Sequence, residues 1–299
     1  MAFSPDGNIL AAGNMDGTVR FWEVGSGKPT GKVFVHPEDF TNVFSFAFSP
    51  DGKKLASAGT VYSGSLRCWD VATGKELWKH EKFLYCNQAV FSPDGKLLAV
   101  SGYRTLYLLD PATGKEIWTA PIDPGFFSFL DFSPDGKTLL SGGLGFRHVR
   151  LWNLCKRQEE FKVELPRGDV HSLVFTGSNT FSIGGHGALH GTWNVEGKRV
   201  GEFLGNVVVQ GRVMSLAVSP NRELLVFGTA KGEFVVFSLK DSQRLIDGIC
   251  GEANVAVAFS PDARLLATTV WNFNPPRSSL KIWDISGLEK ARSASKETK

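Results

Sequence analysis

Apolar and polar positions along the chain follow the pattern of short β-strands separated by tight turns. Residues 43–48 (VFSFAF) alternate and are rich in Phe, and residues 54–59 (KLASAG), 65–71 (SLRCWDV) and 76–80 (ELWKH) are further short apolar runs. The intervening SPDG and ATGK are turn sequences, in which Pro presets φ, Asp hydrogen-bonds the turn and Gly takes a positive φ. This stretch therefore predicts four antiparallel strands joined mainly by hairpin turns.

The same unit recurs seven times at a nearly constant spacing. The apolar residue before each SPDG-like turn is Phe3, Phe48, Phe91, Phe132, Phe175, Val218 or Phe259, at intervals of 45, 43, 41, 43, 43 and 41 residues. Two of these turns depart from the SPDG sequence: VFTGSN at 174–179 and VSPNR at 218–222. A second marker follows each first one in phase: VRFWEV (19–24), LRCWDV (66–71), LYLLDP (106–111), VRLWNL (149–154), HGTWNV (190–195), FVVFSL (234–239) and LKIWDI (280–285).

A four-stranded meander has two open edges and two faces to bury, so it is not stable alone. Stacking such sheets radially buries their faces, and a period of 41–45 residues suits four strands per blade. No segment shows convincing helical periodicity before the tail. The sequence therefore predicts an all-β fold, a seven-bladed β-propeller of four-stranded antiparallel blades.

The repeat resembles the WD-repeat family over nearly all of residues 1–287. Trp69-Asp70 and Trp283-Asp284 carry the dipeptide that names the family, and the chain has near versions at Trp22-Glu23, Trp152-Asn153 and Trp193-Asn194. The near-consensus style is similar to that of repeats common in bacterial proteins. The resemblance implies a non-enzymatic scaffold that presents loops to a protein partner, without a cofactor.

The chain departs from the family in its buried hydrogen bonds. Typical WD repeats join a His, a Ser, a Trp and an Asp, but here no Gly-His dipeptide stands at the expected position. His36 and His80 lie roughly there, Asp16 is in the expected loop, and the candidate serines are Ser57, Ser101, Ser141 and Ser182. Because no unit shows all four members, we expect stability to come mainly from apolar contacts between blades.

The repeat is out of phase with the two ends of the chain. Only Met1 and Ala2 precede the first copy of the FSPDG marker, and the last unit ends at its third strand. We therefore expect incomplete ring closure, in a chain that is part of a larger protein whose preceding segment supplies the missing strand; the alternative is a naturally open ring. The expected domains are a propeller over residues 1–287 and a basic, disordered tail over 288–299.

Composition and charge suggest protein partners. The chain of 299 residues has 33 Lys and Arg against 30 Asp and Glu, a net charge of +3, which gives no reason to expect nucleic acid or a membrane as a partner. The four cysteines, Cys68, Cys86, Cys155 and Cys250, form no CxxC pair and suit a reducing compartment. We expect a cytoplasmic monomer that binds a protein or peptide.

Motifs for catalysis and metal binding are weak. The sequence has no GxSxG or HExxH motif, and His186 and His190 lie in a Gly-rich loop with His148 as the only candidate third metal ligand. Residues 68–78 and 108–118 resemble repeats of quinone-cofactor dehydrogenase propellers, so an enzyme of that kind or a lactonase-like propeller remains the alternative. We expect no catalytic, cofactor or metal site.

The resemblance to the WD-repeat family implies that the loops between blades and those between strands two and three share one face, which is the expected binding face. It places the SPDG and ATGK turns on the other face, which should be short, regular and polar, with little to recognise. Aromatic and Arg side chains are enriched at interface hot spots. The candidate protein-binding residues are Tyr62, Tyr103, Arg104, Phe146, Arg147, His148, His186, His190, Trp271 and Phe273, the last two in the longest insertion, VWNFNPPRSS at 270–279. These side chains either contact a partner or fold down and plug the mouth of the ring.

Overall fold

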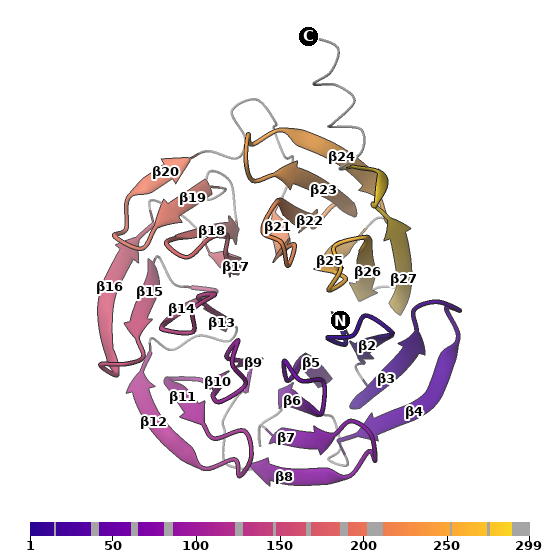
Figure 1. The fold of residues 1–299 in the computed structure, drawn as a ribbon, viewed down its shortest axis with the longest axis horizontal. Coiled ribbons are helices and arrows are strands. Elements are labelled where there is room, and N and C mark those ends of the chain that lie inside the picture. The colour runs from indigo at the N-terminus through magenta and orange to yellow at the C-terminus, as the bar shows by residue number, and fades with distance from the viewer. Residues whose placement is uncertain are drawn as a thin grey trace.

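Seven antiparallel sheets stand around a central axis like the blades of a propeller (Figure 1). The computed structural model describes residues 1–14, 16–36, 42–60, 65–80, 86–122, 128–145, 148–165, 169–185, 191–201, 212–251, 253–273 and 276–288. Each blade is a meander of neighbouring strands, with its first strand nearest the axis and its last at the rim. The predicted all-β, seven-bladed fold is confirmed.

Six blades have four strands and the seventh has three among the described residues. Blade 1 comprises β1 (Ala2–Phe3), β2 (Ile9–Gly13), β3 (Thr18–Glu23) and β4 (Pro29–Val35); blade 2, β5 (Asn42–Phe48), β6 (Lys54–Thr60), β7 (Ser65–Asp70) and β8 (Glu76–His80); blade 3, β9 (Gln88–Phe91), β10 (Leu98–Ser101), β11 (Thr105–Leu109) and β12 (Glu116–Pro121). Blade 4 comprises β13 (Ser128–Phe132), β14 (Thr138–Gly143), β15 (His148–Asn153) and β16 (Gln158–Glu164); blade 5, β17 (Val170–Phe175), β18 (Thr180–Gly185), β19 (Gly191–Asn194) and β20 (Arg199–Gly201); blade 6, β21 (Val213–Val218), β22 (Leu224–Thr229), β23 (Glu233–Ser238) and β24 (Arg244–Ile249); blade 7, β25 (Asn254–Phe259), β26 (Leu265–Phe273) and β27 (Pro276–Asp284).

The turn between the first two strands of a blade is held by a buried serine. In blade 2, Ser49 Oγ donates to Asp51 Oδ1 at 2.6 Å and accepts from the backbone N of Lys54 at 2.9 Å. The hydrogen bond from Ser49 and the one from the Lys53 backbone lower the pKa of the Asp51 carboxyl. The same Ser–Asp pair recurs in blades 1, 3, 4 and 7, and blade 6 has Ser219 with Asn221 instead. SPDG is therefore a structural turn.

Four of these turns also pack against the turn of the preceding blade. A Cβ at Gly52 would lie 3.5 Å from Cδ of Pro5, and Gly95 and Gly136 stand in the same relation to Pro50 and Pro93. The series continues across the chain ends, where a Cβ at Gly7 would lie 3.6 Å from Cδ of Pro261. Blades 7 and 1 thus meet at the same spacing as blades that are consecutive in sequence.

Apolar clusters fill most of the interfaces between blades. Six of the seven clusters of buried residues join side chains from two neighbouring blades, and one of these packs Phe3 and Leu10 of blade 1 against Ala267 of blade 7. The expectation of a three-stranded blade 7 beside a short first strand is confirmed, because β1 has two residues and β25 to β27 form that blade. Leu288, the first residue of the predicted tail, packs against the cluster of blades 6 and 7, and the rest of that tail lies outside the described residues.

Buried hydrogen bonds of the WD type survive in part. His36 Nε2 lies 2.6 Å from Ser57 Oγ, which also accepts from Trp69 Nε1 at 2.8 Å. Blade 7 has a chemically different version, in which Cys250 Sγ donates to Thr268 Oγ1 at 3.3 Å and Trp283 Nε1 donates to the same oxygen at 2.9 Å.

The other candidates for this network behave differently. Ser141 Oγ accepts from Trp152 Nε1 at 2.8 Å, and His80 Nε2 lies 2.5 Å from the carbonyl of Gly114. Complete His, Ser, Trp and Asp sets of the WD-repeat type are therefore scarce among the described residues, as the sequence predicted.

The inner strands are linked by side chains that accept from the backbone of the next blade. Gln88 Oε1 accepts from Leu130 N at 2.6 Å, and Asp131 Oδ2 accepts from Phe175 N at 2.6 Å. Ser45, Ser172 and Ser215 do the same at 3.0–3.2 Å. Burial raises the pKa of Asp131 from its ordinary 3.8 to about 7, although the hydrogen bond from Phe175 and the charge of Arg222 lower it.

Replacing Ser57 with Ala should destabilise the fold by about 1–3 kcal/mol, because the buried His36 and Trp69 groups would lose a shared partner. Chemical denaturation measures the change. Ser286→Ala is the control, since that hydroxyl bonds Asp284 at the surface, and equal effects of the two variants would contradict the assignment.

The carboxyl of Asp131 should make stability depend on pH. Because its folded-state pKa lies above the unfolded value, protonation favours the folded state, and stability present below about pH 4 is lost as the pH rises to about 7. The side chain keeps some solvent exposure, so we expect a loss of about 1–2 kcal/mol. Asp131→Asn should lack this loss in denaturation curves between pH 4 and 8, and parallel curves for both proteins would refute it.

Candidate functional site

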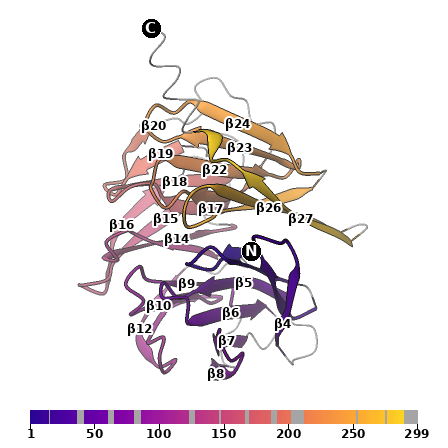
Figure 2. The same ribbon diagram turned by 45° about the vertical axis from the view of Figure 1, so that its right-hand side comes forward.

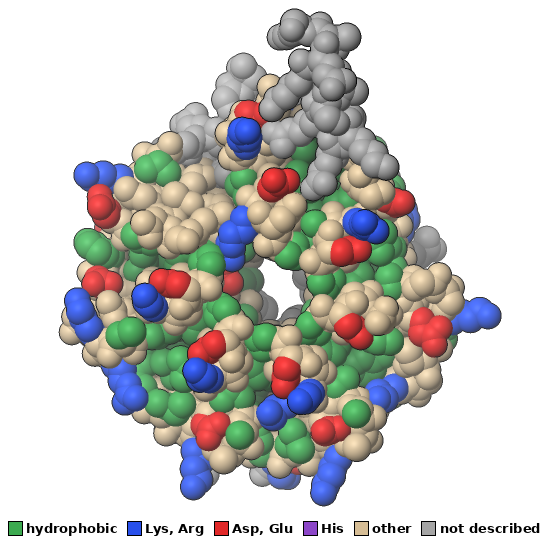
Figure 3. Space-filling view, viewed as in Figure 1, with side chains coloured by type: hydrophobic (Ala, Val, Ile, Leu, Met, Phe, Trp, Pro, Cys, Tyr) green, Lys and Arg blue, Asp and Glu red, His purple; other side chains and the backbone are tan. Residues whose placement is uncertain are grey.

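The propeller has two faces of different construction. We call the side with the loops between blades and between each blade's second and third strands the loop face, and the opposite side, with the SPDG-like and ATGK-like turns, the turn face. Figure 3 shows the turn face, with charged side chains standing on the turns around an open central channel. The sequence analysis placed all candidate binding residues on the loop face.

The structure describes the side chains of three of those candidates. Tyr103 and Arg104 form the loop between β10 and β11, and His148 begins β15 in the neighbouring blade. Tyr62, Phe146, Arg147, His186 and His190 lie outside the described residues. The backbones of Trp271 and Phe273 are described but their side chains are not.

Tyr103 and Arg104 form a compact pair. The Arg104 guanidinium carbon lies 5.5 Å from the centroid of the Tyr103 ring, close enough for a cation–π contact. Arg104 is exposed and Tyr103 half-buried. The loop is fixed at its base, because the carbonyl of Arg104 accepts from Ile122 N at 3.0 Å. The pair therefore presents a positioned cation and an aromatic ring on the loop face.

Buried polar groups lie next to the base of this loop. Asn87 N donates to the carbonyl of Ser101 at 2.9 Å, and Ser101 Oγ donates to the carbonyl of Ser128 at 3.3 Å. Asn87 is 7% exposed, yet its Nδ2 and Oδ1 have no hydrogen-bond partner among the described residues, and neither does Ser128 Oγ. Such groups are costly to bury unpaired, so water or a polar group of a ligand would stabilise them.

Residues 270–279 differ from the irregular loop that the sequence predicted. β26 continues to Phe273 and β27 begins at Pro276, with Phe273 paired to Pro276 in an antiparallel hairpin. Figure 2 shows this hairpin projecting beyond the body of the ring. Trp271 pairs with Asn254 on one side and with Ser278 on the other. The backbone here is therefore regular β-strand and not an irregular loop.

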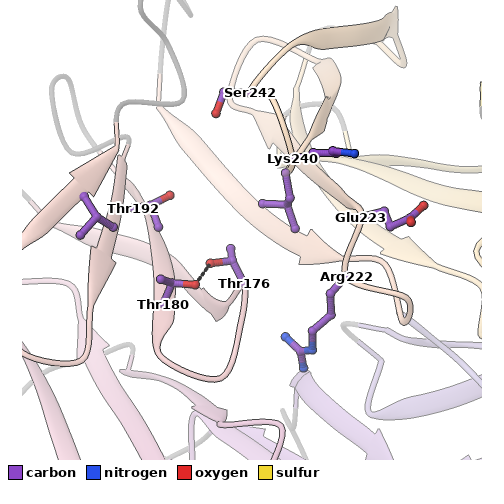
Figure 4. A pocket seen from close by; sticks show the side chains of 9 residues that line it. Thr176, Thr180, Thr192, Arg222, Glu223, Lys240 and Ser242 are labelled. Carbon is purple, nitrogen blue, oxygen red and sulfur yellow. Dashed lines mark hydrogen bonds between the residues drawn. The ribbon is translucent and has the colours of Figure 1, made fainter. Parts of the chain in front are cut away.

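The turn face holds a groove that the sequence analysis missed. It lies between blades 5 and 6 and has a volume of about 410 Å³ (Figure 4). Arg222 enters it from the blade 6 turn, and Thr176 and Thr180 of blade 5 bond each other at 3.0 Å on the opposite side. The sequence contained a signal for this groove, because TGSN and SPNR are the two turns that depart from SPDG.

The described part of the chain gives little support for a metal site or for an activated nucleophile. No group of three or more His, Cys, Asp or Glu side chains placed to share a metal occurs there. Burial raises the pKa of the Cys68 thiol to about 12, so this cysteine is a packing residue and not a nucleophile. Within the same described ranges we find no helix with the length and apolar character that a membrane crossing requires.

Comparison with known families matches the first part of the chain. Residues 1–23 and 27–70 match the family described as WD domain, G-beta repeat. Residues 62–134 match the family described as outer membrane protein assembly factor BamB. The second match includes both segments that resemble quinone-dehydrogenase repeats.

Similar curated proteins cover more of the chain at lower identity. The U3 small nucleolar RNA-associated protein 15 homolog of Xenopus tropicalis is 24% identical over 256 residues, 81% of this chain and 46% of that protein. Guanine nucleotide-binding protein subunit beta-1 of Caenorhabditis briggsae is 27% identical over 147 residues, 48% of this chain and 42% of that protein. Periodic tryptophan protein 2 of Arabidopsis thaliana is 40% identical over 74 residues, 25% of this chain and 8% of that protein.

The chain spans less than half the length of each of these relatives. The chain shares the repeat with these relatives, and the structure has the seven blades that the seven repeats predict. The in-phase markers, the ring of antiparallel sheets and the match over residues 1–23 and 27–70 together support a WD-repeat β-propeller family for this chain.

Proposed function

We propose that this chain is a non-catalytic scaffold that binds a protein or peptide through its loop face. The observation that carries the proposal is the Tyr103–Arg104 pair, a fixed aromatic and cationic contact beside buried polar groups that lack partners. Tyr and Arg supply much of the binding energy at protein interfaces. The turns on the opposite face hold the ring rigid, so little ordering cost would accompany binding.

The relatives support a scaffold in general terms. They include a subunit of a guanine nucleotide-binding protein and a protein whose name states an association with small nucleolar RNA. The match to an assembly factor covers the same residues that suggested a quinone enzyme. A propeller enzyme is accordingly the less favoured alternative, and thermal stabilisation by a quinone with calcium would revive it.

Partner class and compartment are finer proposals. We propose protein partners and a monomeric chain, and the small net charge supports a surface without affinity for nucleic acid or membranes. The absence of a nucleic-acid partner stays a prediction, because one relative is named for an RNA association. The four free thiols support a reducing compartment, for which we propose the cytoplasm. The bacterial character of the repeats also stays a prediction, since the relatives named above are eukaryotic.

Tyr103→Ala combined with Arg104→Ala should abolish partner binding and leave the melting temperature unchanged, because the pair stands at the end of a hairpin and outside the apolar clusters. Affinity capture from source cells, quantified by mass spectrometry, measures the loss. Lys53→Ala with Lys96→Ala on the turn face is the matched control. Retention of all partners by the loop-face variant, with loss in the control, would refute the proposal.

Trp271→Ala combined with Phe273→Ala tests the β26–β27 hairpin as part of the same face. If these side chains contact a partner, the variant should lose it at an unchanged melting temperature. A melting temperature lowered by many degrees with binding intact would show that both residues pack in the core, and they should then be removed from the site.

A further inference from the structure

The interface between blades 5 and 6 departs at both positions from the Pro–Gly contact that four other interfaces share. Where the preceding turn normally supplies Pro, blade 5 has Gly177, and where the next turn supplies Gly, blade 6 has Arg222. The apolar cluster at this place, with Val213 and Phe237, belongs to blade 6 alone, whereas the six other clusters of described residues each join two blades. A groove with several polar side chains opens here on the turn face, while Gly184 of blade 5 packs against Val213 of blade 6 in another part of the interface.

Arg222 is held in a strained conformation that aims it across the interface. Its φ is 57°, in the left-handed region that four other repeats fill with Gly. Nη1 donates to the carbonyl of Phe175 in blade 5 at 2.7 Å. Nε and Nη2 form the other edge of the guanidinium and make no hydrogen bond to a described residue. Two parallel donors of this kind match the two oxygens of a carboxylate.

Hydroxyl groups face this edge from blade 5. Thr176 Oγ1 donates to Thr180 Oγ1, which leaves the hydroxyl proton of Thr180 available to another acceptor. Thr192 and Ser242 add two further hydroxyls to the lining. Glu223 accepts from Asn221 at 3.4 Å, and Figure 4 shows its side chain and that of Lys240 pointing away from the threonines.

A second groove on the same face shows how the usual turn differs. Between blades 2 and 3 the lining includes Asp51 and Asp94, whose carboxylates would repel an anion. The corresponding positions at the groove of blades 5 and 6 are Ser178 and Asn221, both uncharged. Asp131 lies near enough to Arg222 to influence its pKa, but burial of that carboxyl limits how far it is ionised at neutral pH.

The outer end of the groove is apolar. Val200 is 54% exposed on β20, and Leu239 lines the groove from blade 6. A volume of about 410 Å³ is in the range that holds a few side chains of a bound peptide.

We propose that this groove is a second binding site, which takes an extended peptide with a Glu or Asp side chain on the Arg222 edge and a neighbouring aliphatic side chain against Val200 and Leu239. The site is on the turn face, and it does not depend on binding at the loop face. The cation of this site is Arg222, at the turn position that is Gly in the SPDG sequence. The SPDG turns of the ring therefore have no equivalent cation at this position.

The test uses capped octapeptides with a central Glu and one Leu at each of the other positions in turn, on a background of Ser and Gly. Matched peptides carry Gln or phosphoserine in place of Glu. Fluorescence polarisation with the full chain should find at least one Glu peptide that binds about tenfold more tightly than its Gln counterpart, as expected for a charge-assisted bidentate contact.

Arg222→Gly should remove the preference for Glu and fold normally, because Gly adopts a positive φ without strain. Arg157→Gly is the matched control: Arg157 has a φ of 54° in an exposed turn of blade 4, and this variant should keep the preference. Arg222→Gln retains a side-chain donor within reach of Phe175 but no charge, and should also lose the preference.

Three results would overturn the proposal: equal binding of Glu and Gln peptides, an unchanged preference in Arg222→Gly or Arg222→Gln, or Arg222-dependent binding of the phosphoserine peptides alone. Tyr103→Ala with Arg104→Ala should bind the Glu peptides normally. Failure here therefore leaves the loop-face proposal intact, and failure of that proposal leaves this one intact.

Discussion

The contact between Pro of one turn and Gly of the next sets the spacing of the turns at four of the seven interfaces between blades. Each Gly lies within 3.5–3.7 Å, measured from a Cβ at that position, of the preceding blade's Pro ring, so a side chain there would press on the neighbouring blade. The Ser–Asp pair keeps every such turn in one conformation. Because Gly7 meets Pro261 at the distance found within the chain, the same local rule closes the ring, and the apolar clusters between blades fill the space that it defines.

Between blades 5 and 6, where both positions of this contact are replaced, cohesion depends more on polar interactions. Blades 5 and 6 have no shared apolar cluster among the described residues, but Arg222 Nη1 bonds the Phe175 carbonyl and Ser172 accepts from Leu216 N. Asp131 extends this chain of hydrogen bonds to blade 4. Polar contacts of this kind hold the blades together without filling the space between them, which leaves room for a groove.

Strands, turns and their phase could be predicted from the sequence because they depend on neighbours within a few residues. The pairing of Cys250 with Thr268 and Trp283 could not, since a Cys does not resemble the His that it replaces and the three residues come together only in the folded blade. The extended backbone of residues 270–279 was obscured by two prolines, of which Pro276 starts β27. The groove was missed because it forms between two turns that depart from SPDG. They are about 43 residues apart in the sequence and meet across one interface only in the folded ring.

The three-stranded blade shows which part of a blade the ring requires. Second strands such as β10 and β22 are buried along their whole length, whereas rim strands such as β4 and β16 each bury one of seven residues. Ring closure rests on β1, β2 and β26, with the Gly7–Pro261 contact, and all of these lie inside the rim. A fourth strand adds little buried surface, so the three described strands of blade 7 are enough to pack against blade 1.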